Sequence, residues 1–158
     1  MIFTTKAEYG VRLLVQLGLQ GGEIPVSLKA IAEAESLPLA YLERIAALLK
    51  KAGLVTSVRG AHGGYVLARP PEEITMDDAV LALKGAIAPM DCFLDDHDGR
   101  VQCSHGEDFG TCATKLLWTR VQMGVIKSLQ RTTLAELVEF ASPGGRDPIQ
   151  DTHLEIHG

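Results

Sequence analysis

Three cysteines, the only ones in the chain, fall in one short acidic stretch: Cys92, Cys103 and Cys112, spaced C-x10-C-x8-C. An odd number of thiols leaves one sulfur unpaired in any disulfide scheme. Three thiolates are also one ligand short of the four that a tetrahedral metal ion or a cubane cluster takes. If this stretch binds a metal, a fourth ligand that is not cysteine is therefore required.

The residue types favour an iron-sulfur cluster, 2Fe-2S or 4Fe-4S, over zinc. Structural zinc sites usually contain closely spaced cysteine pairs, and the chain has none. Iron-sulfur clusters favour thiolates, and an oxygen or nitrogen ligand in the fourth position leaves one iron open to small molecules such as nitric oxide or dioxygen. Nearby candidates for that ligand are His105, Asp91 and His97. The alternative that these are three reduced thiols without metal stays open.

Length and charge restrict the class of protein. With 158 residues, 46% of them hydrophobic, the chain can bury one good core, or one small domain plus a dimerisation element. Residues 1–70 contain eight Lys or Arg against five acids, a net charge of +3, and the remainder contains seven against fifteen, a net charge of -8. The basic part is the expected nucleic-acid face, and the overall charge of -5 argues against a general polyanion binder.

The absence of long apolar runs makes us expect a cytosolic protein without membrane contact. No run approaches the roughly eighteen residues of a membrane span, and no signal-peptide cleavage pattern is present. In a reducing cytosol, clustered thiols indicate metal or redox chemistry more often than structural disulfides.

The periodicity of apolar residues predicts three helices and then a hairpin. The expected helices cover about residues 5–20, 27–34 and 38–52, and the expected strands cover 54–59 and 65–68. Ser27 is the expected N-cap of the second helix, Pro38 the first residue of the third, and Gly53 its terminator. Leu42, Ile45, Ala46 and Leu49 mark the inner face of the third helix. This order predicts a mainly α fold with a small β-hairpin wing, a winged helix-turn-helix.

Further helices are expected after the break at residues 69–71. One helix begins at an acidic capping box, Thr75 with Asp78, and a last short helix begins at the capping box of Thr133 with Glu136. Between them, after a loop over residues 86–111, a long helix over 112–130 has one side lined by Leu117, Val121, Gly124, Val125 and Ser128. An isolated helix of that length needs a partner. We expect a DNA-binding domain over 1–71, the cysteine loop and dimerisation helices over 72–141, and a disordered tail over 142–158.

The third helix is the expected DNA-reading helix. In helix-turn-helix proteins the second helix of the pair enters the major groove with its N-terminal residues near base edges. Glu43 can accept from a cytosine amino group and Arg44 can donate to guanine, while Lys50 and Lys51 lie near the DNA backbone. Ser27 and Tyr41 can bond phosphates.

The hairpin tip is the second expected DNA contact. Arg59 and His62 stand among glycines, and the backbone of Gly60, Gly63 and Gly64 allows close approach to a narrow minor groove, where Arg is attracted. The plainer interpretation is that all these groups are solvated charges on a small helical domain, or that the winged unit contacts protein. The combination of element order and charge asymmetry favours DNA.

Four strings resemble the Rrf family of bacterial transcription regulators over about residues 1–141. They are Tyr41-Leu42-Glu43, Gly53-Leu54-Val55, the wing string from Ser57 to Leu67, and Thr133-Leu134-Ala135-Glu136-Leu137. The resemblance implies a homodimer packed through the helix near 112–130, a palindromic operator in double-stranded DNA and, in many members, a cluster held by three loop cysteines. Those cysteines correspond here to Cys92, Cys103 and Cys112.

The chain departs from the family pattern at the fourth ligand. Some members have more tightly spaced cysteines and a ligand His three residues after the last one, where this chain has Lys115. In the nitric-oxide-sensing branch, an acidic residue near the start of the first helix, from the partner subunit, is the fourth ligand. Glu8 matches that position.

We therefore expect a homodimeric transcription regulator, not an enzyme, whose DNA affinity is controlled by an iron-sulfur cluster that responds to redox state, nitric oxide or iron-sulfur status. Repression and activation both stay open. One alternative is a cluster-free regulator that answers to a metabolite or protein partner. A second is a small iron-sulfur electron carrier, against which stand the glycine-rich wing and the lack of a cofactor loop or catalytic cluster.

Overall fold

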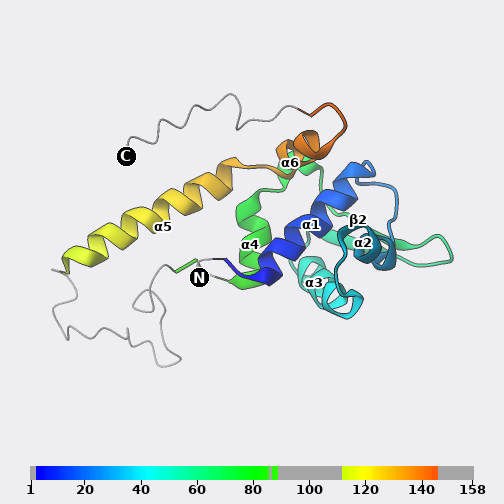
Figure 1. Ribbon diagram of the computed structural model, residues 1–158, viewed down its shortest axis with the longest axis horizontal. Helices are drawn as coiled ribbons and strands as arrows, with labels where there is room; N and C mark the ends of the chain where they lie inside the picture. The colour runs from blue at the N-terminus through cyan, green and yellow to red at the C-terminus, as the bar shows by residue number, and fades with distance from the viewer. Residues whose placement is uncertain (1–2, 86, 89–111, 146–158) are drawn as a thin grey trace.

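Six helices and one β-hairpin make up the part of the chain that the computed structural model describes, residues 3–85, 87–88 and 112–145. The elements, labelled in Figure 1, are α1 (Thr5–Leu19), α2 (Leu28–Glu35), α3 (Leu39–Lys51), β1 (Val55–Val58), β2 (Gly64–Leu67), the 3-10 turn η1 (Pro71–Glu73), α4 (Met76–Lys84), α5 (Ala113–Arg131) and α6 (Leu134–Ala141). The expected winged helix-turn-helix followed by a long helix is confirmed.

The start of the second helix follows the sequence prediction, and the start of the third differs by one residue. The Ser27 hydroxyl oxygen accepts from the backbone N–H of Ala30 at 3.1 Å. Pro38 is the N-cap of α3 rather than its first helical residue, because its ψ of 123° is extended. Its carbonyl already accepts from the N–H groups of Tyr41 and Leu42 at 3.1 Å. An N-cap has this combination of non-helical backbone and an accepting carbonyl.

The two predicted capping boxes differ in completeness. Thr133 and Glu136 form the full reciprocal pair, with N···O distances of 3.3 Å and 2.8 Å. At α4 the Thr75 hydroxyl oxygen accepts from the Asp78 N–H, but the Asp78 carboxylate pairs with Arg69 at 3.2 Å instead of completing the box. Asp is one methylene shorter than the Glu that usually completes such a box, and a cation stands beside it.

The hydrophobic core surrounds α1. Leu13, Leu14 and Leu17 of α1 are fully buried, as are the predicted inner residues of α3. Gly10 and Gly18 let neighbouring helices approach α1, because a Cβ at either position would meet Leu83 of α4 or Val138 of α6. The same core includes Ile74, Ala79 and Leu134, so packing is continuous across residue 71. The predicted domain boundary at that residue therefore stays a prediction about which part has which function.

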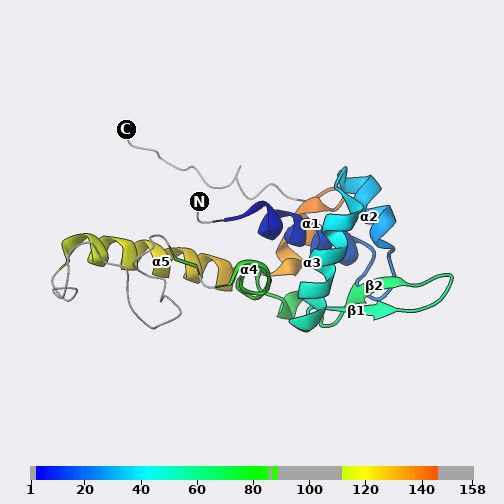
Figure 2. The same ribbon diagram turned by 90° about the horizontal axis from the view of Figure 1, so that it is seen from below.

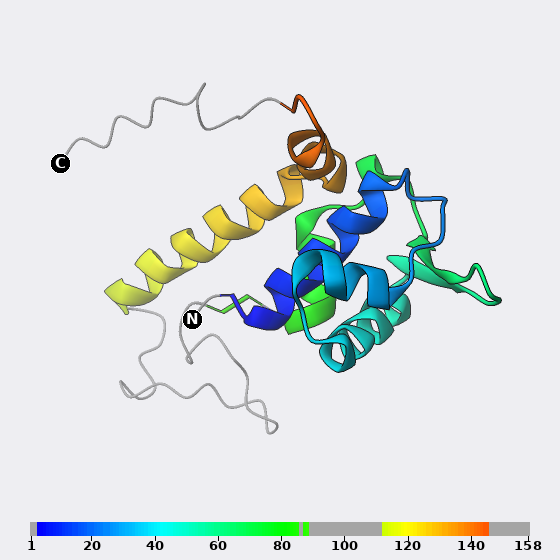
Figure 3. The same ribbon diagram turned by 45° about the vertical axis from the view of Figure 1, so that its right-hand side comes forward.

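α5 projects from this core as a separate arm (Figures 1, 2 and 3). None of its residues is buried, and it packs mainly against α4. Gln122 donates from Nε2 to the carbonyl of Ile87 at 2.6 Å, and Ile126 lies beside Leu81 and Ile87 in a hollow of about 170 Å³. None of the helices in the described ranges is long and apolar enough to cross a lipid bilayer.

A short antiparallel bridge joins the two ends of the segment that contains α4 and α5. Thr75 pairs with Thr133, the Met76 N–H donates to the Thr132 carbonyl at 2.9 Å, and the Leu134 N–H donates to the Ile74 carbonyl at 2.8 Å. The predicted loop over 86–111 and the predicted disordered tail fall almost entirely on residues 86, 89–111 and 146–158, which lie outside the described residues.

Candidate nucleic-acid interface and metal site

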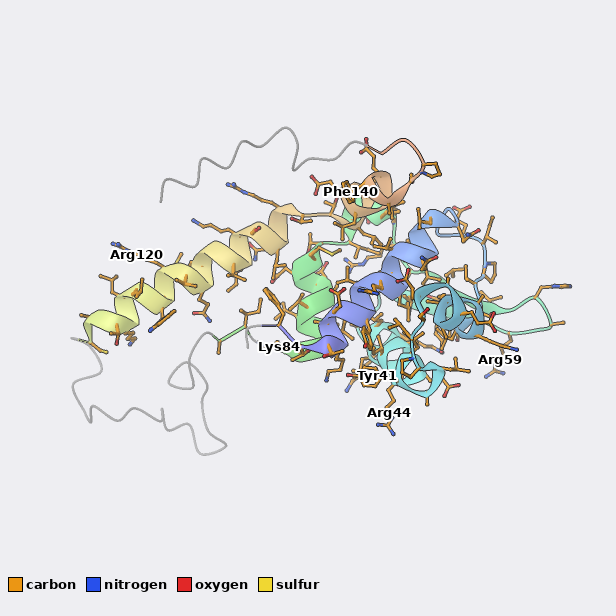
Figure 4. All side chains as sticks on the ribbon, in the orientation of Figure 1. Tyr41, Arg44, Arg59, Lys84, Arg120 and Phe140 are labelled. Carbon is orange, nitrogen blue, oxygen red and sulfur yellow. The ribbon has the colours of Figure 1, made fainter. Side chains whose placement is uncertain are left out.

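α3 separates its buried face from a polar face. Leu42, Ile45, Ala46 and Leu49 are 0% exposed, and their helical spacing turns the intervening residues outward. Glu43, Arg44 and Lys51 are exposed on that outer face. In Figure 4, Arg44 on α3 and Arg59 on the wing point away from the body of the molecule. The predicted DNA-reading side chains are therefore accessible together.

Tyr41, predicted as a phosphate contact, is partly buried against α1. Its ring meets the ring of Tyr9 edge to face, with centroids 5.7 Å apart and planes at 84°. Such aromatic pairs stabilise the contact between the two helices and leave the hydroxyl as the polar end of Tyr41. Sequence reasoning did not identify Tyr9, because the pair lies between two separate helices.

Ser27 keeps a donor for DNA although it caps α2. Its oxygen accepts from the Ala30 N–H, which leaves the hydroxyl proton free to donate. The residue is exposed at the N-terminus of α2, where a helix dipole favours an anion. A phosphate at this position is compatible with both properties.

The wing is a regular antiparallel hairpin tied to the helices beneath it. Val55, Thr56, Ser57 and Val58 face Leu67, Val66, Tyr65 and Gly64 in register. Tyr65 also exchanges two backbone hydrogen bonds with Val26, at 2.9 and 3.0 Å, just before the N-cap of α2. Lys50 of α3 donates from Nζ to the Ser57 hydroxyl at 2.6 Å. Arg59, Gly60 and His62 are exposed at the tip.

The structure gives reasons for the wing glycines within the protein itself, whereas the sequence analysis explained them by close approach to DNA. A Cβ on Gly64 would collide with the Val26 backbone, so this glycine allows the wing to approach α2. A Cβ on Gly63 would meet the Val58 carbonyl across the hairpin. Gly60 has open space around it and a φ of +121°, so there the backbone conformation requires glycine.

Cys112, the one described cysteine, is the N-cap of α5. Its sulfur lies 3.1 Å from the Thr114 hydroxyl oxygen and near the first amides of the helix. Hydrogen bonds from the Thr114 side chain and from the Lys115 backbone lower the pKa of the Cys112 thiol below its usual value. The residue is partly exposed. A thiolate is the form that binds metal, so this environment favours a ligand.

Glu8, the predicted fourth ligand, stands in the first turn of α1 with an exposed carboxylate. Arg12 donates from Nε to Glu8 at 2.9 Å and lies 3.6 Å from Glu35 of α2. Hydrogen bonding and charge from Glu8 raise the pKa of Arg12. Gln16 donates to the same Glu35 at 2.5 Å. The (i, i+4) spacing of Glu8 and Arg12 indicates an ion pair on a helix. The sequence analysis considered Glu8 as a metal ligand and did not use this spacing.

The metal site as a whole is not assembled within the described residues. No three His, Cys, Asp or Glu side chains in those ranges gather as a metal site. Cys92 and Cys103, and the alternative ligands Asp91, His97 and His105, lie outside them. Cys112 and Glu8 are thus the two predicted ligands whose surroundings the structure gives.

Comparison with known proteins matches the family model Rrf2, described as an iron-dependent transcriptional regulator, to residues 3–140. The protein rrf2 of Nitratidesulfovibrio vulgaris is 37% identical over 142 residues, covering 90% of each chain. The structure of CymR, the global cysteine regulator of Bacillus subtilis, aligns with a TM-score of 0.73 at 35% identity, covering 90% of this chain and 99% of CymR. The structure of IscR from T. potens aligns with a TM-score of 0.71 at 36% identity, covering 93% of both.

Proposed function

Because the chain belongs to the Rrf2 family of transcriptional regulators, we propose that it is a cytoplasmic homodimer whose affinity for a palindromic operator is controlled by an iron-sulfur cluster. The family model is described as a transcriptional regulator, and the relative CymR is named as one, not as an enzyme. The observation that supports the cluster most directly is the confinement of all three cysteines between α4 and the N-cap of α5. That segment joins the DNA-reading part to the helix proposed for dimerisation.

The DNA-reading mechanism uses α3 and the wing together. Glu43 and Arg44 on the outer face of α3 read base edges in the major groove, and Arg59 at the wing enters the adjacent minor groove. Ser27 and Lys51 bond the phosphates on either side, which fixes the register without reading sequence. Two such units bind half-sites about 34 Å apart, one helical turn of DNA.

Dimerisation uses the side of α5 that the sequence predicts for it. Leu117 on this side is 53% exposed, and Val121 and Val125, which follow it, are partly exposed. Gln122, Ile126 and Leu129 lie next to this side on the helix, toward α4 and the core. Packing of the Leu117 side against the same side of a second copy buries apolar surface and gives the two-fold symmetry of a palindromic operator.

The cluster is proposed to be held by Cys92, Cys103 and Cys112, with Glu8 of the partner subunit as fourth ligand. The lowered pKa and partial exposure of Cys112 fit this role, as does the exposed Glu8 carboxylate at the start of α1. When bound, the group supplies an iron with one weak oxygen ligand that nitric oxide or dioxygen can displace. The structure thus supports the ligand chemistry at two of the four positions.

Glu8 connects this site to the DNA-reading helices. Its present partner, Arg12, also faces Glu35 at the end of α2. A carboxylate that binds metal leaves Arg12 to Glu35 alone, which changes the charge balance between α1 and α2. α2 positions α3 through their packing, so the ligand state of Glu8 can alter the placement of the recognition helix.

The test is anaerobic purification of the full chain, followed by an absorption spectrum, iron and sulfide assays, and operator binding before and after cluster loss. Replacing Cys92, Cys103 or Cys112 with Ala should each remove most bound iron. Glu8→Ala should leave a cluster with an altered spectrum and faster reaction with oxygen, and operator affinity should no longer follow cluster state. Glu23→Ala, another exposed acid near one end of α1, is the matched control and should behave as wild type.

Two results contradict the proposal at different points. A cysteine variant with wild-type iron and sulfide removes that residue from the ligand set. If Glu8→Ala matches wild type while His105→Ala alters the spectrum, the fourth ligand is local to the cysteine segment and the coupling through Arg12 is wrong.

A second candidate is a cluster-free regulator, favoured by the similarity to CymR, which is named a global cysteine regulator. In this alternative the DNA-reading mechanism is the same and the signal is a metabolite or protein partner. The two candidates are separated by the same purification. A colourless protein without iron that binds its operator fully would establish the alternative.

A further inference from the structure

Lys50 was predicted as a contact to the DNA backbone, but in the structure its ammonium group is engaged within the protein. The residue stands in the last turn of α3, and its Nζ donates to the Ser57 hydroxyl oxygen at 2.6 Å. The neighbouring cation Lys51 is exposed, and its ammonium group makes no hydrogen bond or ion pair to the described residues. Two adjacent lysines of the same helix therefore have different surroundings.

The alternation of β1 explains why Ser57 meets Lys50. Side chains of a strand point alternately to opposite faces, so Ser57 shares a face with Val55, which is 1% exposed and part of the core. Thr56 and Val58 are exposed on the other face. The Ser57 hydroxyl is thus directed toward α3 by the register of the hairpin.

This bond is one of several ties that orient the wing, together with backbone hydrogen bonds from the Leu67 N–H to the Gly22 carbonyl at 2.9 Å and from the Leu54 N–H to the Leu49 carbonyl at 3.0 Å. At β2, Tyr65 is fixed to Val26 by two backbone hydrogen bonds beside the N-cap of α2. At β1, the side-chain bond from Lys50 fixes Ser57 to the end of α3. Arg59 is the residue that follows Val58, the last residue of β1. Any rotation of β1 about the α2 tie therefore moves Arg59 relative to α3.

We propose that Lys50 is a positioning residue for DNA recognition, which holds the wing against α3 through Ser57 so that Arg59 and the α3 base-reading residues reach adjacent grooves together. Lys50 does not act as a phosphate contact, and Lys51 does. The proposal rests on the proposed DNA-reading role of α3 and the wing. Since the bond is exposed to water, its effect on affinity is modest, severalfold rather than a thousandfold.

The test compares operator binding by wild type, Lys50→Ala, Ser57→Ala and the double variant, with Lys51→Ala as the matched lysine control, over a series of salt concentrations. Lys50→Ala and Ser57→Ala should each weaken binding about threefold, and the double variant should be no weaker than either, because both remove one interaction. Lys51→Ala should lower the slope of log affinity against log salt by about 1, and Ser57→Ala should leave it unchanged. Ser57→Thr, which keeps the hydroxyl and suits a strand, should retain wild-type affinity.

The opposite pattern overturns the proposal. If Ser57→Ala binds as tightly as wild type while Lys50→Ala lowers the salt slope as much as Lys51→Ala, Lys50 is a phosphate contact. Loss of affinity in Ser57→Thr equal to that in Ser57→Ala would show that the hydroxyl is not the relevant group. Failure of the underlying DNA-reading role looks different, since the wild-type protein would then bind a scrambled duplex as well as the operator.

Discussion

The DNA-reading part and the α5 arm differ in how completely contacts within one chain bury their apolar residues. α1, α3 and α4 surround fully buried leucines, and every buried side-chain polar atom in the described residues has a partner. α5 is the longest helix described and has no buried residue, while Leu116, Leu117 and Met123 are each more than half exposed. The apolar residues of the first part are buried within the chain, whereas α5 exposes several of its apolar residues to solvent.

This difference indicates where a signal can act. A well-packed core resists local change, because its side chains have few alternative arrangements. An arm attached mainly through α4 can change its angle or partner at smaller cost. The cysteines lie in the sequence between α4 and α5, so Cys112 stands at the start of an element that has no buried residue and packs mainly against α4.

The largest effect is expected for a core deletion. Leu42→Ala should lower the free energy of unfolding by about 2–5 kcal/mol, because Leu42 is fully buried and the change leaves a cavity. The same substitution at Leu117, which is 53% exposed, should cost less than about 0.5 kcal/mol at concentrations where the chain is monomeric. Urea denaturation at low protein concentration measures both. Equal losses would show that α5 is supported by its own chain.

The next effect concerns self-association. Val121→Asp should weaken the dimer at least tenfold, about 1.4 kcal/mol, since a carboxylate on the Leu117 side of α5, where the second copy is proposed to pack, has to be desolvated without a partner. Lys127→Gln, on a different side of the same helix, is the control and should dimerise normally. Sedimentation equilibrium gives both constants. If Lys127→Gln dissociates and Val121→Asp does not, the dimer uses the other side of the arm.

A smaller loss of stability is expected from a change at Thr133, the N-cap of α6. Thr133→Ala should lower the unfolding free energy by about 1 kcal/mol, because it removes one half of the complete capping box with Glu136. Thr56→Ala, an exposed strand threonine, serves as control and should change stability less. Thermal unfolding monitored by circular dichroism measures the melting temperature of both variants. Equal decreases would show that the capping box does not contribute to stability.

The smallest effect is a change in the reactivity of Cys112. Thr114→Val removes the hydrogen bond that contributes most to lowering the thiol pKa, so the pKa should rise toward its usual value. The thiolate fraction at neutral pH then falls, and alkylation of Cys112 in the reduced, metal-free protein should slow severalfold, with the pH profile displaced upward. Thr119→Val on the same helix should leave the profile unchanged. Peptide mass spectrometry resolves Cys112 from the other two thiols.

Much of the fold was predictable because local signals decide it. The apolar spacing of α3 identified its four buried residues, and the hydroxyls of Ser27 and Thr133 marked helix starts that the structure places at the same residues. The sequence failed where a side chain has two possible partners. Asp78 pairs with Arg69 rather than completing its capping box, a choice that depends on how the chain folds back.

The site was less predictable, because its contacts join separate elements. The tie between Lys50 and Ser57 depends on the register of a hairpin, and the contact of Tyr9 with Tyr41 depends on how two helices cross. Neither has a local pattern in the sequence. The outward placement of Glu43 and Arg44 followed from the apolar periodicity of α3, and that of Arg59 from its position at a glycine-rich hairpin turn, whereas the structural need for Gly64 beside Val26 was not predicted.

The bridge between Thr75 and Thr133 also has a consequence for how the chain can vary in length. The ends of the intervening segment are held together by backbone hydrogen bonds at the core around α1, so that segment is a closed loop in the polymer sense. The entropy of closing a loop grows only with the logarithm of its length, and doubling the length costs about 0.6 kcal/mol. The bridge thus anchors both ends of this segment on the core around α1, whatever the number of residues between α4 and α5. A change in that number is expected to leave the bridge and the packing of the DNA-reading part in place.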